Sequence, residues 1–159
     1  MHSIKAAEPA TSVKQVAHAR LSELGDRQGR PAQILITVLY TTSTQTARAY
    51  GHALRLAREL KGRIKLLVPQ TVPYPLPLEA PSAEPETFAA RLSLMLDGSE
   101  IDTTVEVRLC REPWEGIRTA LPAGSIVVVG CDGRWWPCRA MRLARRLKRD
   151  GHLVLTAIG

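Results

Sequence analysis

The sequence has few aromatic residues, few cysteines and no long apolar run. One Phe, three Trp and three Tyr are its only aromatic residues among 159, which is little material for the stacking platforms that bind single-stranded nucleic acid. Its three widely spaced cysteines do not form a disulfide framework, which favours a reducing, cytoplasmic location. No stretch of about 18 apolar residues is present, which argues against a membrane-spanning helix, and the polar N-terminus lacks the apolar core of a signal peptide.

Residue patterns that hold a metal ion or perform covalent catalysis are also missing. The four histidines are scattered along the chain, and none has cysteines or other histidines at metal-ligand spacing. The spacing indicates no Ser/His/Asp arrangement and no paired carboxylates. The sequence therefore favours a binding protein over an enzyme. It predicts no metal site and no required cofactor, and it leaves ATP or another nucleotide as an alternative ligand.

The charge is concentrated in one segment. The formal net charge is +7, and residues 130–152 contain six Arg and one Lys against two Asp. Such an excess of positive charge favours an anionic ligand or partner. The same segment contains the loop GCDGRWWPC at residues 130–138, where Cys131 and Cys138 leave open a redox pair. Residues 125–158 are therefore the first place to look for a functional site.

Five strands are expected. Residues 34–40 (ILITVLY) and 126–129 (IVVV) are continuous apolar runs, typical of strands buried on both faces of a parallel sheet. Residues 104–110 alternate apolar and polar side chains, which indicates an edge strand with one wetter face. Residues 64–68 and 153–158 complete the set.

Helices are expected between these strands. The first is capped by the hydroxyls of residues 41–43 and ended by Gly62. The proline-rich residues 69–85 are expected to form an extended surface loop rather than sheet or helix. The remaining helices are expected at residues 86–96, 114–121 and 138–149. The buried face of the first helix is expected to consist of Ala47, Tyr50, Gly51, Leu54, Ala57 and Leu60.

The alternation of strands and helices predicts one Rossmann-like, three-layer α/β domain over residues 33–159. Its five-stranded parallel sheet has the expected order 3-2-1-4-5, because this order places the two most apolar strands side by side in the middle. Residues 1–32 are expected to form a tail and an extra helix. The helix is indicated by apolar residues at helical spacing, namely Val13, Val16, Ala17, Leu21 and Leu24.

A ligand site is expected at one end of this sheet. In open α/β sheets, ligands bind beyond the carboxyl ends of the strands where the winding reverses. Here that crevice lies between the loops after Tyr40 and Gly130. Main-chain N–H groups there would bind an anion, although Asp132 places a negative charge in the same loop. Arg134 would add a guanidinium, and Trp135 would either stack on a flat ligand or pack on the domain. The candidate ligand-binding residues are Tyr40, Thr41, Thr42, Gly130, Gly133, Arg134 and Trp135.

The order of elements and two motifs resemble the universal stress protein family, part of the adenine-nucleotide α-hydrolase-like group. The resemblance covers residues 33–159. One motif is ILITVLYTTSTQTARAYGHALRLARELKG, which is similar to the family's opening strand and helix. The other is SIVVVG with Gly130-x-x-Gly133, which is similar to the start of its phosphate loop. The resemblance implies the same fold and, as in many family members, a homodimer formed through the last strand, residues 153–158.

The sequence departs from the pattern of ATP-binding members in two places. Those members usually have an Asp at the end of the first strand, which binds the ribose, and this sequence has Leu39. Their phosphate loop reads G-x2-G-x9-G-(S/T), and this sequence has Leu143 and Ala144 at the last two positions. The resemblance therefore implies a non-catalytic binding or regulatory protein with a degenerate ATP site. The alternative is retained binding of a nucleotide or phosphate ligand in the crevice.

The helix expected at residues 138–149 has an arginine-rich side. At about 100° per residue, Ala140, Leu143 and Leu147 fall in one sector and the arginines in the opposite one. This basic face is either solvated or a contact surface for nucleic acid or an acidic partner, and no DNA-reading motif accompanies it. The arginines of the basic face are Arg139, Arg142, Arg145, Arg146 and Arg149.

Overall fold

The computed structural model describes residues 19–20, 33–78, 90–92, 94, 96, 98–133 and 138–159. Its strands are β1 (Ala19–Arg20), β2 (Leu35–Leu39), β3 (Arg63–Thr71), β4 (Thr103–Cys110), β5 (Ile126–Cys131) and β6 (Leu153–Ile158). Its helices are α1 (Ser43–Leu60), α3 (Pro113–Ala120) and α4 (Arg139–Arg149). Residues 90–92, 94 and 96 are also helical.

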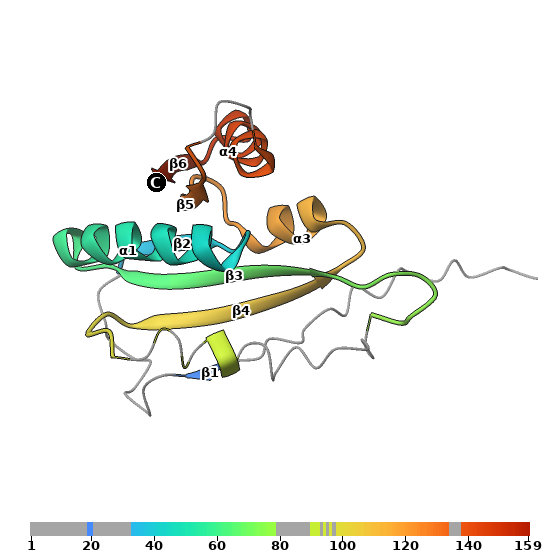
Figure 1. Ribbon diagram of the computed structural model, residues 1–159, viewed down its shortest axis with the longest axis horizontal. Helices are drawn as coiled ribbons and strands as arrows, with labels where there is room; N and C mark the ends of the chain where they lie inside the picture. The colour runs from blue at the N-terminus through green and yellow to red at the C-terminus, as the bar shows by residue number, and fades with distance from the viewer. Residues whose placement is uncertain are drawn as a thin grey trace, which may run out of the picture.

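The strands form one sheet with the order β1-β4-β3-β2-β5-β6 (Figure 1). From β4 to β6 every pair of neighbouring strands is parallel. Counted along the chain from β2, these five parallel strands confirm the predicted order 3-2-1-4-5 and the Rossmann-like α/β fold. Within the described ranges, no helix is long and apolar enough to cross a membrane.

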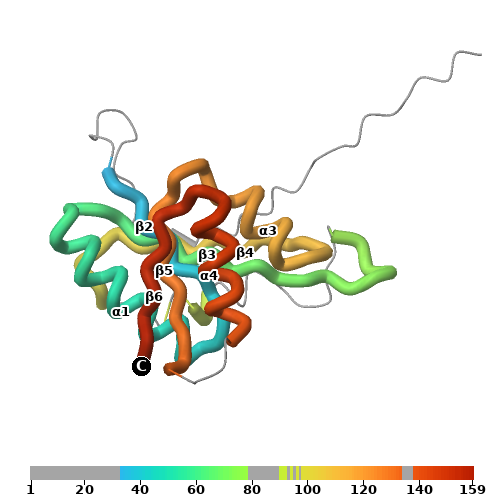
Figure 2. Tube along the Cα trace, turned by 90° about the horizontal axis from the view of Figure 1, so that it is seen from above, coloured from blue at the N-terminus to red at the C-terminus, as the bar shows by residue number. Residues whose placement is uncertain are grey.

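Helices cover both faces of the sheet, which gives the three predicted layers. Ile36 and Val38 of β2 pack with α1, and Leu92 of the helical segment packs into the same cluster. Leu39 and Leu67 lie in a second cluster with α3 and α4. Helix α4 contacts β5 and β6 (Figure 2). Both faces of β2 and of β5 are therefore covered by helices, as their continuous apolar runs predict.

The helix expected within residues 1–32 is wrong at two positions. Ala19 and Arg20 are extended and pair antiparallel with Val105 and Thr104 of β4. The rest of the expected helix lies outside the described residues. The outer edge of β4 presents unpaired main-chain N–H and C=O groups, and pairing with an extended segment satisfies them. The main-chain hydrogen bonds formed by this pairing outweigh the narrow apolar stripe on which the helix prediction was based.

Helix α1 packs on the sheet through a stripe of small residues. Ala49, Ala53 and Ala57 are fully buried, and their small side chains let the helix approach the strands closely. The expected buried face is therefore wrong at Ala47 and Leu60, which are exposed. The larger leucines are displaced toward the margins of the helix because the centre of the contact has no room for them.

The end of α1 and the start of the proline-rich segment also differ from expectation. Lys61, not Gly62, takes the left-handed conformation that ends the helix, with φ 51°. Pro69 lies inside β3, in register with Arg108. On β3, the main-chain groups of Leu67 and of residue 69 point to the same side, toward β2. The carbonyl oxygen of Leu67 accepts a hydrogen bond from Tyr40 N at 2.9 Å, whereas residue 69 lies beyond the end of β2. A main-chain N–H at residue 69 would find no acceptor on β2, so its absence in proline costs little stability.

Replacing Gly130 by Ala is expected to destabilise the domain. A Cβ at residue 130 would overlap the main-chain carbonyl group of Gln45, so α1 would have to move away from β5. We expect a loss of about 3 kcal/mol in the free energy of unfolding, measured by urea denaturation. Gly51→Ala is the control, because a Cβ there meets nothing within 4 Å and should stabilise the helix by about 0.5–1 kcal/mol. An unchanged unfolding midpoint for Gly130→Ala would contradict this close packing.

Candidate functional site

The structure brings together the two loops of the predicted crevice. Strands β2 and β5 are paired neighbours, so the residues that follow them lie at the same edge of the sheet. Tyr40, Thr41 and Thr42 follow β2, while Gly130 lies in β5 and Gly133 shortly after it. The predicted residues Arg134 and Trp135 lie outside the described residues.

The first turn of α1 lies directly against the end of β5. The main chain of Gln45 lies directly against Gly130, where no side chain intervenes. The Gln45 side chain donates from Nε2 to Oδ2 of Asp132 at 2.7 Å. Arg48 donates from Nη1 to Oδ1 of the same carboxylate at 3.1 Å. The carboxylate of Asp132 thus takes the donors and the positive charge that an incoming phosphate would need.

Of the hydroxyl groups after β2, that of Thr42 begins the helix, whereas that of Thr41 is buried and has no hydrogen-bond partner among the described residues. Thr42 is the N-cap of α1, and its side chain accepts a hydrogen bond from Gln45 N at 3.3 Å. Thr46 accepts from Thr41 N through its hydroxyl oxygen at 3.1 Å. The Tyr40 hydroxyl lies 3.5 Å from the hydroxyl oxygen of Ser43. The bond to Gln45 N satisfies one of the main-chain N–H groups at the helix N-terminus that an anion would otherwise bind.

Leu39 stands where ATP-binding members of the resembled family have an aspartate. Its side chain is fully buried in the cluster under α3 and α4, together with Leu67 and Val129. An apolar side chain cannot accept a hydrogen bond from a ribose hydroxyl. Its burial on the face opposite α1 also indicates that this position contributes to the core rather than to the crevice.

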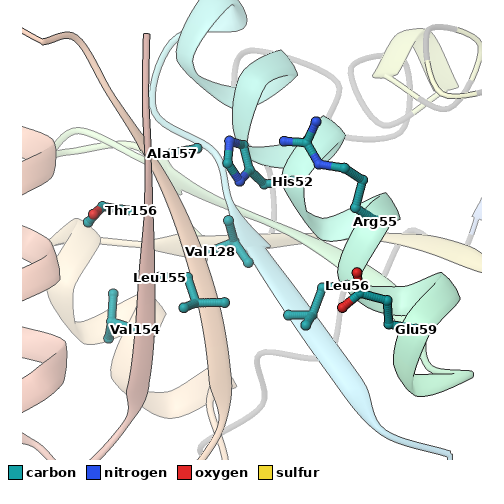
Figure 3. A pocket seen from close by; sticks show the side chains of 9 residues that line it. All are labelled: His52, Arg55, Leu56, Glu59, Val128, Val154, Leu155, Thr156 and Ala157. Atoms are coloured by element: carbon teal, nitrogen blue, oxygen red, sulfur yellow. The ribbon is translucent and has the colours of Figure 1, made fainter.

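A separate groove lies between α1 and the last strand, and the sequence analysis did not identify it. Its cavity volume is about 450 Å³. Figure 3 shows His52 and Arg55 on the helix wall and Val128 and Leu155 on the strands. The spacing of His52, Arg55 and Glu59 in the sequence places all three on one side of α1, and this pattern could have indicated the helix wall of the groove. The groove has an apolar floor and one charged wall, and its other side is open.

Helix α4 separates apolar and basic residues as predicted. Ala140, Ala144 and Leu147 are buried, and all five arginines of the basic face are exposed. One of these arginines has a specific contact, since the guanidinium of Arg146 lies 4.0 Å from the centre of the Trp114 ring. This cation–π contact ties α4 to α3. The freely solvated part of the basic face is therefore smaller than the sequence indicated.

The cysteines differ in their environments. Cys131 is fully buried, and burial raises its pKa to about 11, with further contributions from the Cys138 thiol and the Asp132 carboxylate. Cys138 is half-buried at the N-cap of α4. Burial also raises the pKa of Cys110, whose Sγ lies 3.6 Å from the carbonyl oxygen of Gln70. Across the described residues, no three His, Cys, Asp or Glu side chains gather in a way that could hold a metal ion.

The crevice between the loops after β2 and β5 is expected to bind no nucleotide. Calorimetric titration with ATP, AMP and inorganic phosphate should give no saturable heat, because the Asp132 carboxylate already binds Gln45 and Arg48 and Leu39 offers no acceptor. Asp132→Asn is the diagnostic variant, since it removes the negative charge without removing the side chain. Saturable ATP heat in the wild-type protein would contradict the expectation. Heat that appears only in Asp132→Asn would show that charge, rather than lack of space, keeps phosphate out.

Comparisons with known proteins add no relative to this picture. Neither a family model nor a curated protein nor a solved structure matches this chain. Because one fold can hold many unrelated functions, the arrangement of strands and helices does not by itself identify an activity. The function is therefore inferred from the contacts at the carboxyl edge, at β6 and on α4.

Proposed function

We propose that this chain is a non-catalytic binding or regulatory protein of the universal stress protein type, with a degenerate ATP site, and that it acts as a homodimer. The proposal is supported first by the crevice at the carboxyl edge. Gln45 and Arg48 bind the half-exposed carboxylate of Asp132, and Leu39 is part of the core. A scaffold that keeps the fold while its crevice presents a carboxylate and lacks a ribose acceptor is suited to contacts with other macromolecules.

The observation that carries the dimer is the free edge of β6. Strand β6 pairs with β5 on one side, and no strand pairs with its other side within the described part of the chain. Three apolar side chains on β6 are exposed, Leu153 by 59%, Leu155 by 42% and Ile158 by 60%. Unpaired edges with exposed apolar residues associate readily with another strand. A second copy paired along β6 would satisfy the main chain and bury these side chains.

The thiols support a reducing location. Cys110, Cys131 and Cys138 are all free, and the raised pKa values of Cys110 and Cys131 keep both protonated at neutral pH. A protonated thiol is a poor nucleophile and metal ligand. This supports a cytoplasmic protein in which the buried cysteines pack as small apolar residues.

The dimer is tested by the mass of the protein in solution. Light scattering after size-exclusion chromatography should give twice the mass of one chain. Leu155→Lys should shift the mass to that of a monomer, because a charge at this position would be desolvated in the joined sheet. Leu94→Lys is the matched control, since Leu94 is 72% exposed on the helical segment beside β4 and should stay dimeric. A monomeric wild-type protein would refute the dimer.

A second candidate function is favoured by α4, namely binding of nucleic acid or an acidic partner. Arg139, Arg142, Arg145 and Arg149 are exposed, and none of them takes part in the ion pairs formed by described residues. A row of unpaired cations along one helix attracts polyanions through counterion release. This surface lies on the α4 side of the sheet, so it does not compete with the groove beside α1.

The basic face is tested by the salt dependence of DNA binding. Fluorescence anisotropy with a short duplex should show affinity that falls steeply with salt, by a slope of about 0.9 per phosphate contact on logarithmic axes. Changing Arg142, Arg145 and Arg149 together to Glu should abolish binding. The control changes three exposed arginines elsewhere by the same charge, namely Arg58, Arg63 and Arg91. Equal loss in both triple variants would show a net-charge effect and would refute a specific α4 surface.

A further inference from the structure

The face of β6 that points toward α1 is only partly covered. Val128 and Ala157 pack in the cluster beneath α1. Side chains alternate along a strand, so Leu153 and Leu155 point to the same face as Ala157. Leu153 is 59% exposed and Leu155 is 42% exposed. Helix α1 therefore stops short of the β6 edge, and the groove of about 450 Å³ beside it has Leu155 in its floor.

The helix wall of this groove has basic side chains toward one end and an acidic side chain toward the other. His52 and Arg55 lie toward the first end and Glu59 toward the second (Figure 3). The step from His52 to Glu59 is a rise of about 10 Å along the helix. All three side chains are exposed, and none takes part in the ion pairs formed by described residues. A second copy of this wall that runs in the opposite direction would present its Glu59 to His52 and Arg55.

We propose that a second copy of the chain closes the open side of this groove, and that Glu59 of each copy pairs with His52 and Arg55 of the other. This contact rests on the proposed dimer and adds a second surface, on α1, to the pairing along β6. In a two-fold dimer each surface meets itself. A two-fold axis perpendicular to the sheet makes both β6 strands antiparallel and both α1 helices antiparallel, so each ion pair occurs twice.

The positions of strand and helix agree with this symmetry. The groove is lined by residues 154–157 of β6 and by α1 between His52 and Glu59. Because the two segments flank the same groove, an axis through the middle of residues 154–157 passes beside the middle of the helical segment, between Arg55 and Leu56. Such an axis places His52 opposite Glu59 of the second copy, with Arg55 about one turn away.

The spacing of the strands sets the distance between the two helices. The main chain of Gln45 on α1 lies against Gly130 of β5, so α1 lies above β5. Two copies joined along β6 have three strand spacings between one β5 and the other, about 14 Å. Helices in direct contact are about 8–10 Å apart, so the two main chains do not touch, and the long side chains of Arg55 and Glu59 span the gap. Leu155 of both copies lies beneath these ion pairs and loses its contact with water.

Charge reversal followed by mixing tests this contact. Arg55→Glu makes the wall acidic at two positions and Glu59→Arg makes it basic throughout, so each variant repels its own copy. We expect the dimer Kd of either variant alone to rise about 100-fold in sedimentation equilibrium, because each reversed charge meets a like charge twice. Mixed in equal amounts, the two variants should form a mixed dimer of wild-type affinity, which native mass spectrometry resolves. Mixing cannot restore an ion pair within one helix, because both chains of the mixture lack it.

The matched control is Arg58→Glu mixed with Glu115→Arg. Both side chains are exposed and neither lines the groove, so each variant should remain a homodimer and the mixture should show no preference for the mixed dimer. His52→Glu is a second acidic variant, which should also pair preferentially with Glu59→Arg.

The outcomes separate this contact from the dimer itself. A dimeric wild-type protein whose Kd is unchanged by Arg55→Glu and by Glu59→Arg would overturn the contact and leave the β6 dimer standing. A mixture of these two variants without preference for the mixed dimer would overturn it as well. A wild-type protein that is monomeric would refute both the dimer and the contact. A mixed dimer of wild-type affinity also shows that both variant chains fold.

Discussion

Helix α1 lies in direct contact with β5 at Gly130, and the arrangement of the carboxyl edge depends on this contact. Only a residue without a side chain lets the main chain of Gln45 come so close. From that position Gln45 and Arg48 reach Asp132 in the loop after β5. The contact thus joins the first helix to a loop more than 80 residues later. It also places polar groups of the protein itself where a Rossmann-like fold offers space to a ligand.

The two edges of the sheet differ in how well they are protected against pairing with strands of other molecules. At the β4 side, a short antiparallel strand covers part of the edge, and the half-buried carboxylate of Glu106 pairs with both Lys65 and Arg108. Charges directed over an edge strand discourage association with other strands. At the β6 side, Leu153, Leu155 and Ile158 are exposed instead. This asymmetry favours association through β6 over association through β4.

Helix α4 joins the core of the domain to its most basic surface. Helix α4 packs Ala144 and Leu147 on the sheet and presents arginines to solvent, one of which stacks on Trp114. Its N-cap is Cys138, which lacks a side-chain capping bond and packs against the cluster that contains Cys131.

The sequence by itself determined the order of the parallel strands, because continuous apolar runs are stable only where both faces of a strand are covered. It also determined the division of α4 into apolar and basic sides, since helical periodicity alone sets this. Only the tertiary structure decided which residues α1 buries, which side chains of α1 bind Asp132 and how Ala19–Arg20 pair with β4. These features depend on close approaches and pairings between segments far apart along the chain, and local propensity does not record them.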